Sequence, residues 1–289
     1  MGIPALHSLV SSEARHAGAM RIAGGLAYRE SGPRDGPVAL LLHGYPESSY
    51  MWRDVLPALE AAGWHAIAPD LAGFGDSEPD PPGTWERRVE SIERFRSELG
   101  IDSCVPVVHD WGGLIGLRWA CEHPEAVRAL VISSTGFFPD GKWHGMAEAL
   151  RTPGTGEQVV EAIDREGFGG LLRSVSPSMG DDALDEYWKA YADEPRRRGQ
   201  LELYRSGDFS HLARYDLAAL DVPVLLVWGE KDEFAPPAGA HRFDRELADT
   251  ELVLVEGAGH FVWEDAPGAC LQALTSFLAR MPASSGSST

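Results

Sequence analysis

The chain has 289 residues, enough for one large core, and its composition of 44% hydrophobic and 24% charged residues is ordinary for a globular enzyme. Its formal net charge of −19 argues against binding to nucleic acid or an anionic membrane surface, because no excess of basic side chains is present to contact phosphates. No apolar run approaches the length of about 20 residues that crosses a bilayer. The three cysteines do not have the spacing of metal ligands. We therefore expect a cytoplasmic protein without metal or cofactor.

Short apolar runs alternate with segments of helical length along most of the chain. The runs typical of strands are residues 38–42, 65–68, 105–108, 129–133, 222–228 and 251–255. Amphipathic segments lie between several of them, at residues 51–62, 89–99, 114–122 and 238–247. Continuous apolar strands that alternate with helices predict an α/β fold with a mostly parallel sheet and helices on both faces. Residues 20–30 are expected to add antiparallel edge strands.

The alternation stops between residues 137 and 215, where no strand-like run occurs. Helical pieces recur there, at residues 158–166, 181–192 and 199–205. We interpret 137–215 as a helical cap inserted into an α/β core formed by residues 1–136 and 216–281. The alternative, ordinary helices within the layers beside the sheet, fits less well with so long a stretch without a strand. Residues 282–289 are small and polar, and we expect a disordered tail there.

The segment from Val105 to Gly113 contains the most informative motif. A strand runs into Asp110, which is followed by Trp111, two glycines and a helix. This is the layout of a nucleophile elbow, in which a sharp strand-to-helix turn exposes the nucleophile and directs the first helical N–H groups at its oxygen. A serine usually occupies the position of Asp110. Taken alone, an aspartate there is also a common helix N-cap.

Three other loops supply the groups that such a nucleophile needs. Tyr45 follows an earlier strand, so its backbone N–H and that of Trp111 are the two expected donors of an oxyanion hole. Asp232 comes just past a strand end, and His260 lies on the loop after the last strand. Nucleophile, acid and then histidine is the chain order of the nucleophile-elbow hydrolases. We therefore predict the catalytic triad Asp110, Asp232 and His260.

With these pieces the sequence resembles the α/β-hydrolase superfamily, and within it the branch of epoxide hydrolases and haloalkane dehalogenases. The matching pieces spread over nearly the whole chain: residues 43–48, 70–77, 109–113, the loop of Asp232 and residues 259–261. The resemblance implies an α/β-hydrolase fold, an aspartate nucleophile and a cap that covers the active site. His43 and His109 are expected to have structural roles beneath this site.

An aspartate nucleophile favours one class of reaction. An ionised carboxylate is already nucleophilic at neutral pH, so Asp110 would displace a leaving group at a saturated carbon and form an alkyl ester. His260, oriented by Asp232, would then take a proton from the water that attacks the ester. Carbon–oxygen or carbon–halogen cleavage is therefore preferred to acyl transfer. An esterase and a non-catalytic ligand-binding protein of the same fold are the remaining alternatives.

An epoxide oxygen needs an acid as it leaves. Tyr204 resembles a cap tyrosine of the epoxide hydrolases, whose O–H donates to the developing alkoxide. The second tyrosine of that pattern is absent from residues 137–185. We favour epoxide hydrolysis over the other reactions. We expect a small apolar organic substrate and a monomeric or homodimeric enzyme.

A halide instead needs weak N–H donors in a dry pocket. Trp111 would be one of them, and Trp143 or Trp188 of the cap would be the second. Trp188 lies beside Tyr187 and Tyr191 at helical spacing, which indicates packing within the cap. Many dehalogenases carry Asn or Glu where this chain has Tyr45. Haloalkane dehalogenation is thus the alternative function.

Overall fold

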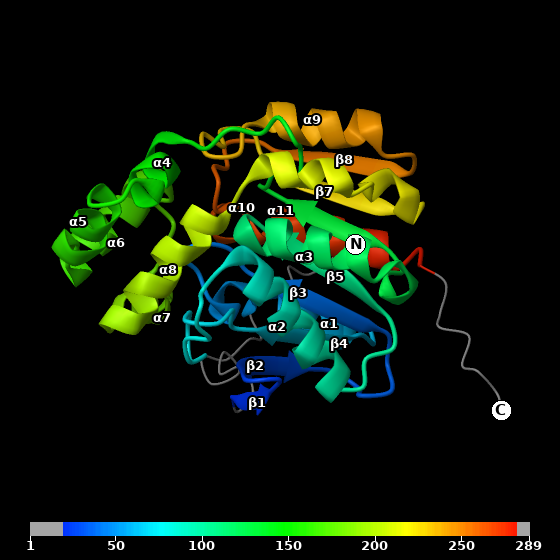
Figure 1. Cartoon of the computed structure of the whole chain (residues 1–289). Helices are drawn as coiled ribbons and strands as arrows, with labels where there is room; N and C mark the ends of the chain where they lie inside the picture. Colours follow the sequence, from blue (N-terminus) through cyan, green and yellow to red (C-terminus); the bar gives the residue numbers. More distant parts are fainter. Residues whose placement is uncertain (1–19, 282–289) are drawn as a thin grey trace, which may run out of the picture.

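In the computed structural model, which describes residues 20–281, eight strands form one sheet in the order β1-β2-β4-β3-β5-β6-β7-β8 (Figure 1). The strands are β1 (Arg21–Ala23), β2 (Leu26–Ser31), β3 (Val38–Leu42), β4 (His65–Pro69), β5 (Cys104–His109), β6 (Leu130–Ser133), β7 (Val224–Gly229) and β8 (Thr250–Val255). The pairs β1–β2 and β2–β4 are antiparallel, whereas all pairs from β4 to β8 are parallel. The predicted parallel sheet with antiparallel edge strands is confirmed.

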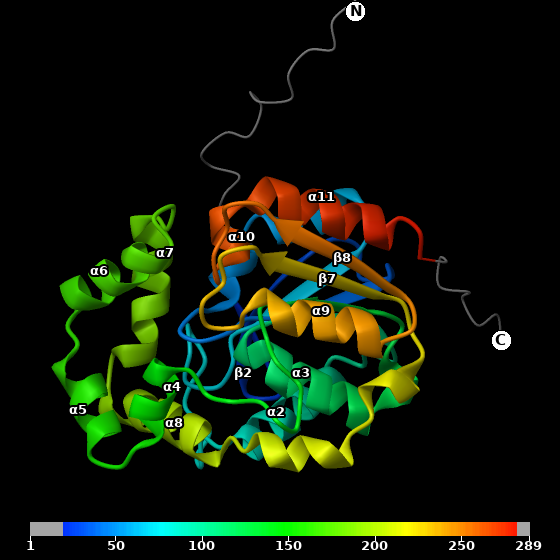
Figure 2. The same ribbon diagram turned by 90° about the horizontal axis from the view of Figure 1, so that it is seen from above.

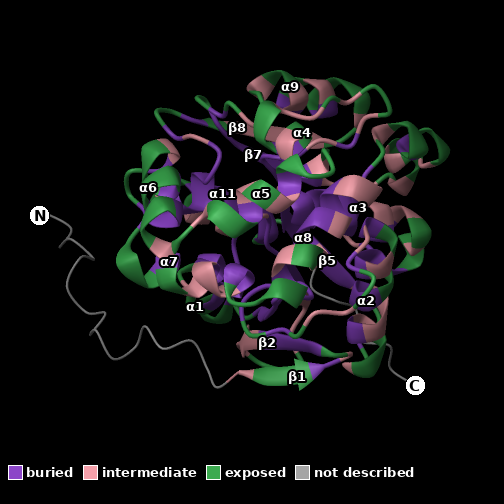
Figure 3. Cartoon of the chain, turned by 60° about the vertical axis from the view of Figure 1, so that its left-hand side comes forward, coloured by how far each residue is buried: buried purple, intermediate pink, exposed green. Residues whose placement is uncertain are grey.

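The central strands are apolar because both of their faces are covered. Every residue of β4, β5, β6 and β7 is buried. On one face of the sheet, α1 (Val55–Ala61) packs beside α11 (Pro267–Leu278). On the other face, α2 (Trp85–Glu98) packs beside α3 (Trp111–Glu122), and α9 (Pro237–Glu246) lies next to β7 (Figure 2). Helices on both faces were predicted, and Figure 3 shows the buried strands between them.

Five α-helices lie between β6 and β7 and form a layer beyond the ends of the strands (Figures 1 and 2). They are α4 (Gly145–Arg151), α5 (Thr155–Ala162), α6 (Arg165–Val175), α7 (Asp181–Trp188) and α8 (Glu194–Ser206). This segment contains no strand. None of the helices in residues 20–281 is long and apolar enough to span a membrane.

Several predicted helix boundaries are wrong, and side-chain caps explain three of them. The helix expected at 158–166 is interrupted between α5 and α6, because the Asp164 side chain accepts a hydrogen bond from Gly167 N and starts a new helix. Asp193 and Thr84 likewise start α8 and α2 earlier than expected. The helix expected at 181–192 ends at Trp188 and continues as a 3₁₀ turn. The helix expected at 51–62 is split into a 3₁₀ turn, Ser49–Trp52, and α1. The tail at 282–289 lies outside the described residues.

Candidate active site

Asp110 lies in a sharp turn between the last residue of β5 and the first residue of α3. Its backbone has φ 47° and ψ −119°, a conformation that residues other than glycine rarely adopt and that is common at functional sites. The two glycines after it make the turn possible. A Cβ at Gly112 would lie 2.3 Å from the carbonyl oxygen of Leu42, and one at Gly113 would lie 2.4 Å from Oγ1 of Thr135. Both residues must therefore lack a side chain for α3 to begin here.

The Asp110 side chain points away from its own helix. It occupies the N-cap position of α3 but makes no capping hydrogen bond, so the N-cap interpretation is wrong for this carboxylate. Its Oδ1 instead accepts a hydrogen bond of 2.7 Å from the Tyr45 backbone N–H. Gly44 permits this approach, since a Cβ there would lie 2.5 Å from Cβ of Asp110. The structure thus directs the predicted nucleophile toward one of the predicted oxyanion donors; the other, the backbone N–H of Trp111, belongs to the next residue of the turn.

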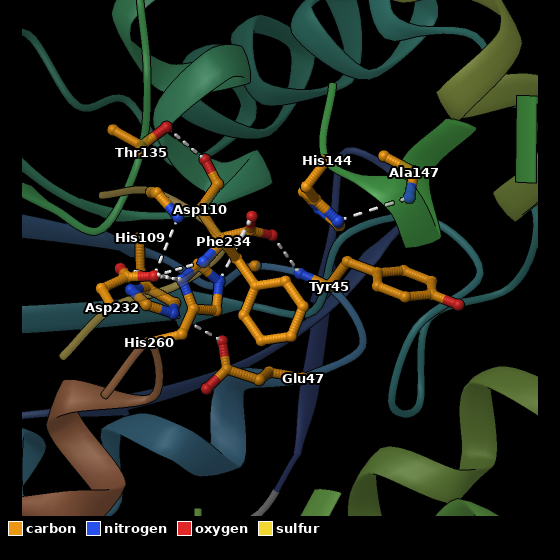
Figure 4. A network of polar contacts seen from close by, with 12 residues as sticks. Tyr45, Glu47, His109, Asp110, Thr135, His144, Ala147, Asp232, Phe234 and His260 are labelled. Carbon is orange, nitrogen blue, oxygen red and sulfur yellow. Dashed lines mark hydrogen bonds and ion pairs between the residues drawn. The ribbon is translucent and has the colours of Figure 1, made fainter. Parts of the chain in front are cut away.

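His260 connects Asp110 and Asp232 (Figure 4). Its Nδ1 lies 3.0 Å from both carboxylate oxygens of Asp232, and its Nε2 lies 3.5 Å from Oδ2 of Asp110. Asp232 Oδ1 also accepts hydrogen bonds from the backbone N–H groups of Phe234 and Ala235, at 2.9 and 2.8 Å. The carboxylate of Asp232 is therefore fixed, and it orients the imidazole. Three loops that are distant in sequence bring the three predicted triad residues together.

The three charges stabilise one another. Burial disfavours the ionised forms of Asp110 and Asp232, but interactions with His260 outweigh it and lower the pKa of both carboxyls. Burial disfavours the imidazolium of His260, but the charges of Asp232 and Asp110 outweigh it and raise the pKa of His260 well above its ordinary value. At neutral pH the resting site is therefore an imidazolium between two carboxylates.

The hydrogen bonds of His43 join it to backbone groups next to this triad. Its Nε2 accepts a hydrogen bond of 2.9 Å from Leu71 N, and its Nδ1 lies 2.8 Å from the carbonyl oxygen of Gly44. Burial lowers the pKa of His43 to about 3, so it is neutral. These contacts hold the loop that contains Gly44 against the loop after β4.

A cavity of about 250 Å³ adjoins Asp110, and aromatic side chains form much of its wall. Trp143 is stacked on Trp111, with ring centroids 5.4 Å apart and an interplanar angle of 22°. Tyr204 meets Trp111 edge to face at 5.2 Å. Phe209 packs against Trp143 at 4.4 Å. Trp111, Trp143 and Tyr204, which were expected to contact substrate or leaving group, therefore all line the cavity beside Asp110.

The phenol of Tyr204 is buried and close to the nucleophile. Burial, followed by the negative charge of Asp110, raises the pKa of Tyr204 well above its ordinary value. The neighbouring Trp111 side chain, edge to face with the Tyr204 ring, opposes this rise only in part. Because its pKa is raised, the phenol keeps its proton at neutral pH, and Tyr204 has this proton available for donation.

Several wall residues were not found from the sequence, and His144 and Phe234 are two of them. His144 lines the cavity, and its Nδ1 accepts a hydrogen bond of 3.4 Å from Ala147 N at the start of α4. Phe234 lies edge to face with both His144 and His260, at 5.0 and 5.2 Å. Neither belongs to a motif; only the position of Phe234, two residues after Asp232, hinted at the site.

Trp188 does not line the cavity; it packs against Phe168 and Tyr191 among the inserted helices. Among residues 20–281 no group of three or more His, Cys, Asp or Glu side chains is placed to hold a metal ion.

A parallel sheet covered by helices, with an acidic residue in a strained strand-to-helix turn that faces a His–Asp pair, defines the class of α/β hydrolases. The sequence model of the Alpha/beta hydrolase family matches residues 39–273. The chain belongs to this family, and it is a hydrolytic enzyme.

Curated relatives match most of the chain. A haloalkane dehalogenase of Bradyrhizobium diazoefficiens is 31% identical over 294 residues, which cover 89% of this chain and 92% of the relative. A cis-3-alkyl-4-alkyloxetan-2-one decarboxylase of Xanthomonas campestris pv. campestris is 29% identical over 280 residues and covers 89% and 93%. Epoxide hydrolase 3 of Siraitia grosvenorii is 29% identical over 280 residues and covers 80% and 88%. The chain is thus similar to enzymes of three different reactions.

Solved structures give the same picture. A putative ancestral haloalkane dehalogenase superposes with a TM-score of 0.77 at 29% identity, covering 91% of this chain and 99% of that chain. One of a set of epoxide hydrolases from metagenomes of hot environments superposes with a TM-score of 0.73 at 26% identity, covering 88% and 95%. The predicted membership in the α/β hydrolases, near the dehalogenases and epoxide hydrolases, is confirmed.

Proposed function

We propose that this enzyme hydrolyses small apolar epoxides through a covalent alkyl ester on Asp110, beneath a cap formed by residues 137–215. The observation on which the proposal mainly depends is the position of Tyr204, a buried phenol that lines the same cavity as Asp110 and lies edge to face with Trp111. The aromatic wall fits an apolar substrate.

In the first step Asp110 acts as the nucleophile. Its carboxylate oxygen attacks an epoxide carbon, the carbon–oxygen bond breaks, and the electron pair goes to the epoxide oxygen. Tyr204 donates its proton to that oxygen, which becomes a hydroxyl group, and the resulting phenolate is stabilised by the Trp111 N–H. The depressed pKa of Asp110 keeps the nucleophile ionised at neutral pH.

Ester formation removes the charge of Asp110. His260 thereby loses one of the two carboxylates that hold its proton, and a proton passes from the imidazolium to the Tyr204 phenolate. The neutral imidazole then takes a proton from water, which attacks the ester carbonyl carbon of Asp110. The Tyr45 and Trp111 backbone N–H groups stabilise the oxyanion, and collapse of the intermediate releases a diol and regenerates the carboxylate.

Haloalkane dehalogenation is the second candidate, supported by the 31% identical dehalogenase. The same triad would act, with the indole N–H groups of Trp111 and Trp143 around the halide. The buried phenol of Tyr204 beside Trp111 favours an epoxide over this candidate, because it supplies a proton that a leaving alkoxide needs and a leaving halide does not.

A His260→Gln variant tests the proposal. Glutamine cannot act as the base, so incubation with a panel of epoxides and haloalkanes should trap an alkyl ester, visible by intact mass and located on the Asp110 peptide. Asp110→Asn should give no adduct. An adduct on a serine would show a different reaction class, and reaction with haloalkanes alone, with halide released, would make the enzyme a dehalogenase.

A further inference from the structure

A second buried carboxyl group lies next to the triad, and the mechanism above does not use it. Glu47 follows Tyr45 by two residues, and its side chain is 0% exposed. Neither of its carboxyl oxygens has a hydrogen-bond partner among the described residues. An ionised carboxylate that is buried without donors or a cation is very costly. The protonation state of Glu47 therefore has to be found from its neighbours.

The neighbour of Glu47 is His109, whose Nε2 lies 3.3 Å from Glu47 Oε2 (Figure 4). The other ring nitrogen, Nδ1, lies 3.3 Å from Ser133 Oγ. The Ser133 hydroxyl donates its only proton to the Val108 carbonyl oxygen and accepts the N–H of Trp263, each at 2.9 Å. Ser133 has no proton left for His109, so the proton must be on Nδ1 of His109.

This assignment leaves Nε2 of His109 without a proton. Burial, followed by the charge of His260, lowers the pKa of His109 to about 3, so its ring is neutral and carries one proton only. An unprotonated nitrogen and an ionised carboxylate would repel each other at 3.3 Å. A proton on the carboxyl group of Glu47 removes this repulsion and converts the contact into attraction.

We propose that Glu47 is a neutral carboxylic acid that positions His109 beneath His260 without adding a third negative charge to the site. The ring centroids of His109 and His260 are 5.1 Å apart, so the orientation of one ring limits that of the other. Burial and then the charge of Glu264 favour the protonated acid, while His260 and the Gly44 backbone oppose this only in part.

The charged groups around Glu47 come from several elements. His109 belongs to β5, Asp110 follows it, and His260 and Glu264 come from the loop after β8 and from α10 (Val262–Asp265). Glu264 is also buried, but it has a cation: Arg53 donates two hydrogen bonds to its carboxylate, at 2.7 and 2.6 Å. Two neighbouring buried glutamates are thus stabilised in opposite ways, one by an arginine and the other by a proton.

The neutral state matters for the second half of the reaction, and this part rests on the proposed function. His260 must lose its proton once Asp110 has become an ester. An ionised Glu47 would replace part of the lost negative charge and keep the imidazolium protonated. With Glu47 neutral, alkylation of Asp110 alone controls the proton on His260. Glu47 therefore supports ester hydrolysis and has little effect on alkylation.

Infrared spectroscopy and single-turnover kinetics test the proposal. The C=O band of a buried protonated carboxyl should be present at neutral pH, shift in D₂O and disappear in Glu47→Gln. Glutamine also donates to His109, so in this variant the rate of ester hydrolysis and the midpoint of its pH profile should stay within about twofold and about 0.2 pH unit of those of the parent. Glu47→Leu should slow ester hydrolysis on the order of tenfold or more, with alkylation changed by less than about twofold.

Two results would overturn the proposal: no carboxyl band lost in Glu47→Gln, or a pH midpoint in this variant that moves to lower pH, as removal of an anion requires. If Glu47→Leu fails to fold, the spectrum and pH profile of Glu47→Gln still decide. Glu264→Gln is the control spectrum and should remove no protonated band, because its carboxylate is paired with Arg53. If no variant forms an ester on Asp110, the proposed function fails, and the infrared result still shows whether Glu47 is protonated.

Discussion

His260 Nε2 lies 3.5 Å from Oδ2 of Asp110, a residue 150 positions earlier in the chain. At this distance each charge stabilises the other, so the protonation of the imidazole depends on whether the carboxylate is free or esterified. In the proposed reaction, this dependence keeps the histidine protonated in the resting enzyme and allows it to act as a base after alkylation.

Asp110→Asn mimics the neutral, esterified aspartate and should lower the pKa of His260. The folded-state pKa of His260 is raised, so in the parent its proton is lost only as the pH rises well above 6.5, whereas in the variant deprotonation should occur at lower pH. NMR titration of the imidazole measures this. Glu233→Gln, the control, changes an exposed carboxylate of the Asp232 loop and should have little effect on the titration of His260. If His260 has the same pKa in Asp110→Asn as in the parent, the charge of Asp110 does not control the protonation of His260.

Asp232→Asn should stop ester hydrolysis while alkylation persists. The asparagine can present its N–H₂ group to Nδ1 of His260 and so favour the wrong tautomer, which in hydrolytic triads costs on the order of 10³–10⁴-fold. Intact mass should show an accumulating alkyl-enzyme. Glu230→Gln, at an exposed position of the same loop, should turn over normally. Rapid hydrolysis by Asp232→Asn would assign the orienting role to another group.

Tyr204→Phe should slow alkylation by epoxides on the order of 10²–10⁴-fold, because the leaving alkoxide loses its proton donor. Alkylation by haloalkanes should be less affected, since a halide leaves without needing a proton. Stopped-flow measurement of single turnovers separates the two. Tyr215→Phe is the matched control: its hydroxyl group donates to Glu122, far from the cavity lining, at 2.6 Å. Undiminished epoxide alkylation in Tyr204→Phe would rule out this tyrosine as the acid.

Glu264→Gln should lower the free energy of unfolding by about 3–5 kcal/mol, because it leaves the Arg53 guanidinium without its buried carboxylate. Tyr187 of α7 also donates to Glu264, so the contact of the inserted helices with the core should weaken too. Urea denaturation measures the loss. Arg280→Gln breaks the exposed pair with Glu251 and should cost less than about 1 kcal/mol. A similar small loss in both variants would show that burial adds nothing to the Arg53–Glu264 pair.

Much of the fold could be read from local patterns. Apolar runs of four to seven residues predicted the central strands, since a strand covered on both faces must be apolar throughout. Helix starts were predicted less well, because capping side chains such as Asp164 and Thr84 act over three residues and override the apolar periodicity.

The sequence by itself determined the strand-to-helix turn at Asp110 and the chain order of Asp110, Asp232 and His260. Asp110 followed by two glycines encodes a strand-to-helix turn locally, and Asp232 and His260 each follow a strand whose end lies at the same edge of a parallel sheet. Such features depend on a few neighbouring residues, so they are visible without coordinates.

Only the tertiary structure decided which side chains meet. The edge-to-face contact of Trp111 with Tyr204, the contact of Phe234 with His260, and the 3.3 Å approach of Glu47 to His109 each join residues from different loops, strands or helices. Their distances result from how the inserted helices and strand ends pack, and no short sequence pattern specifies that packing. The same packing excludes water from Glu47, and this exclusion decides its protonation.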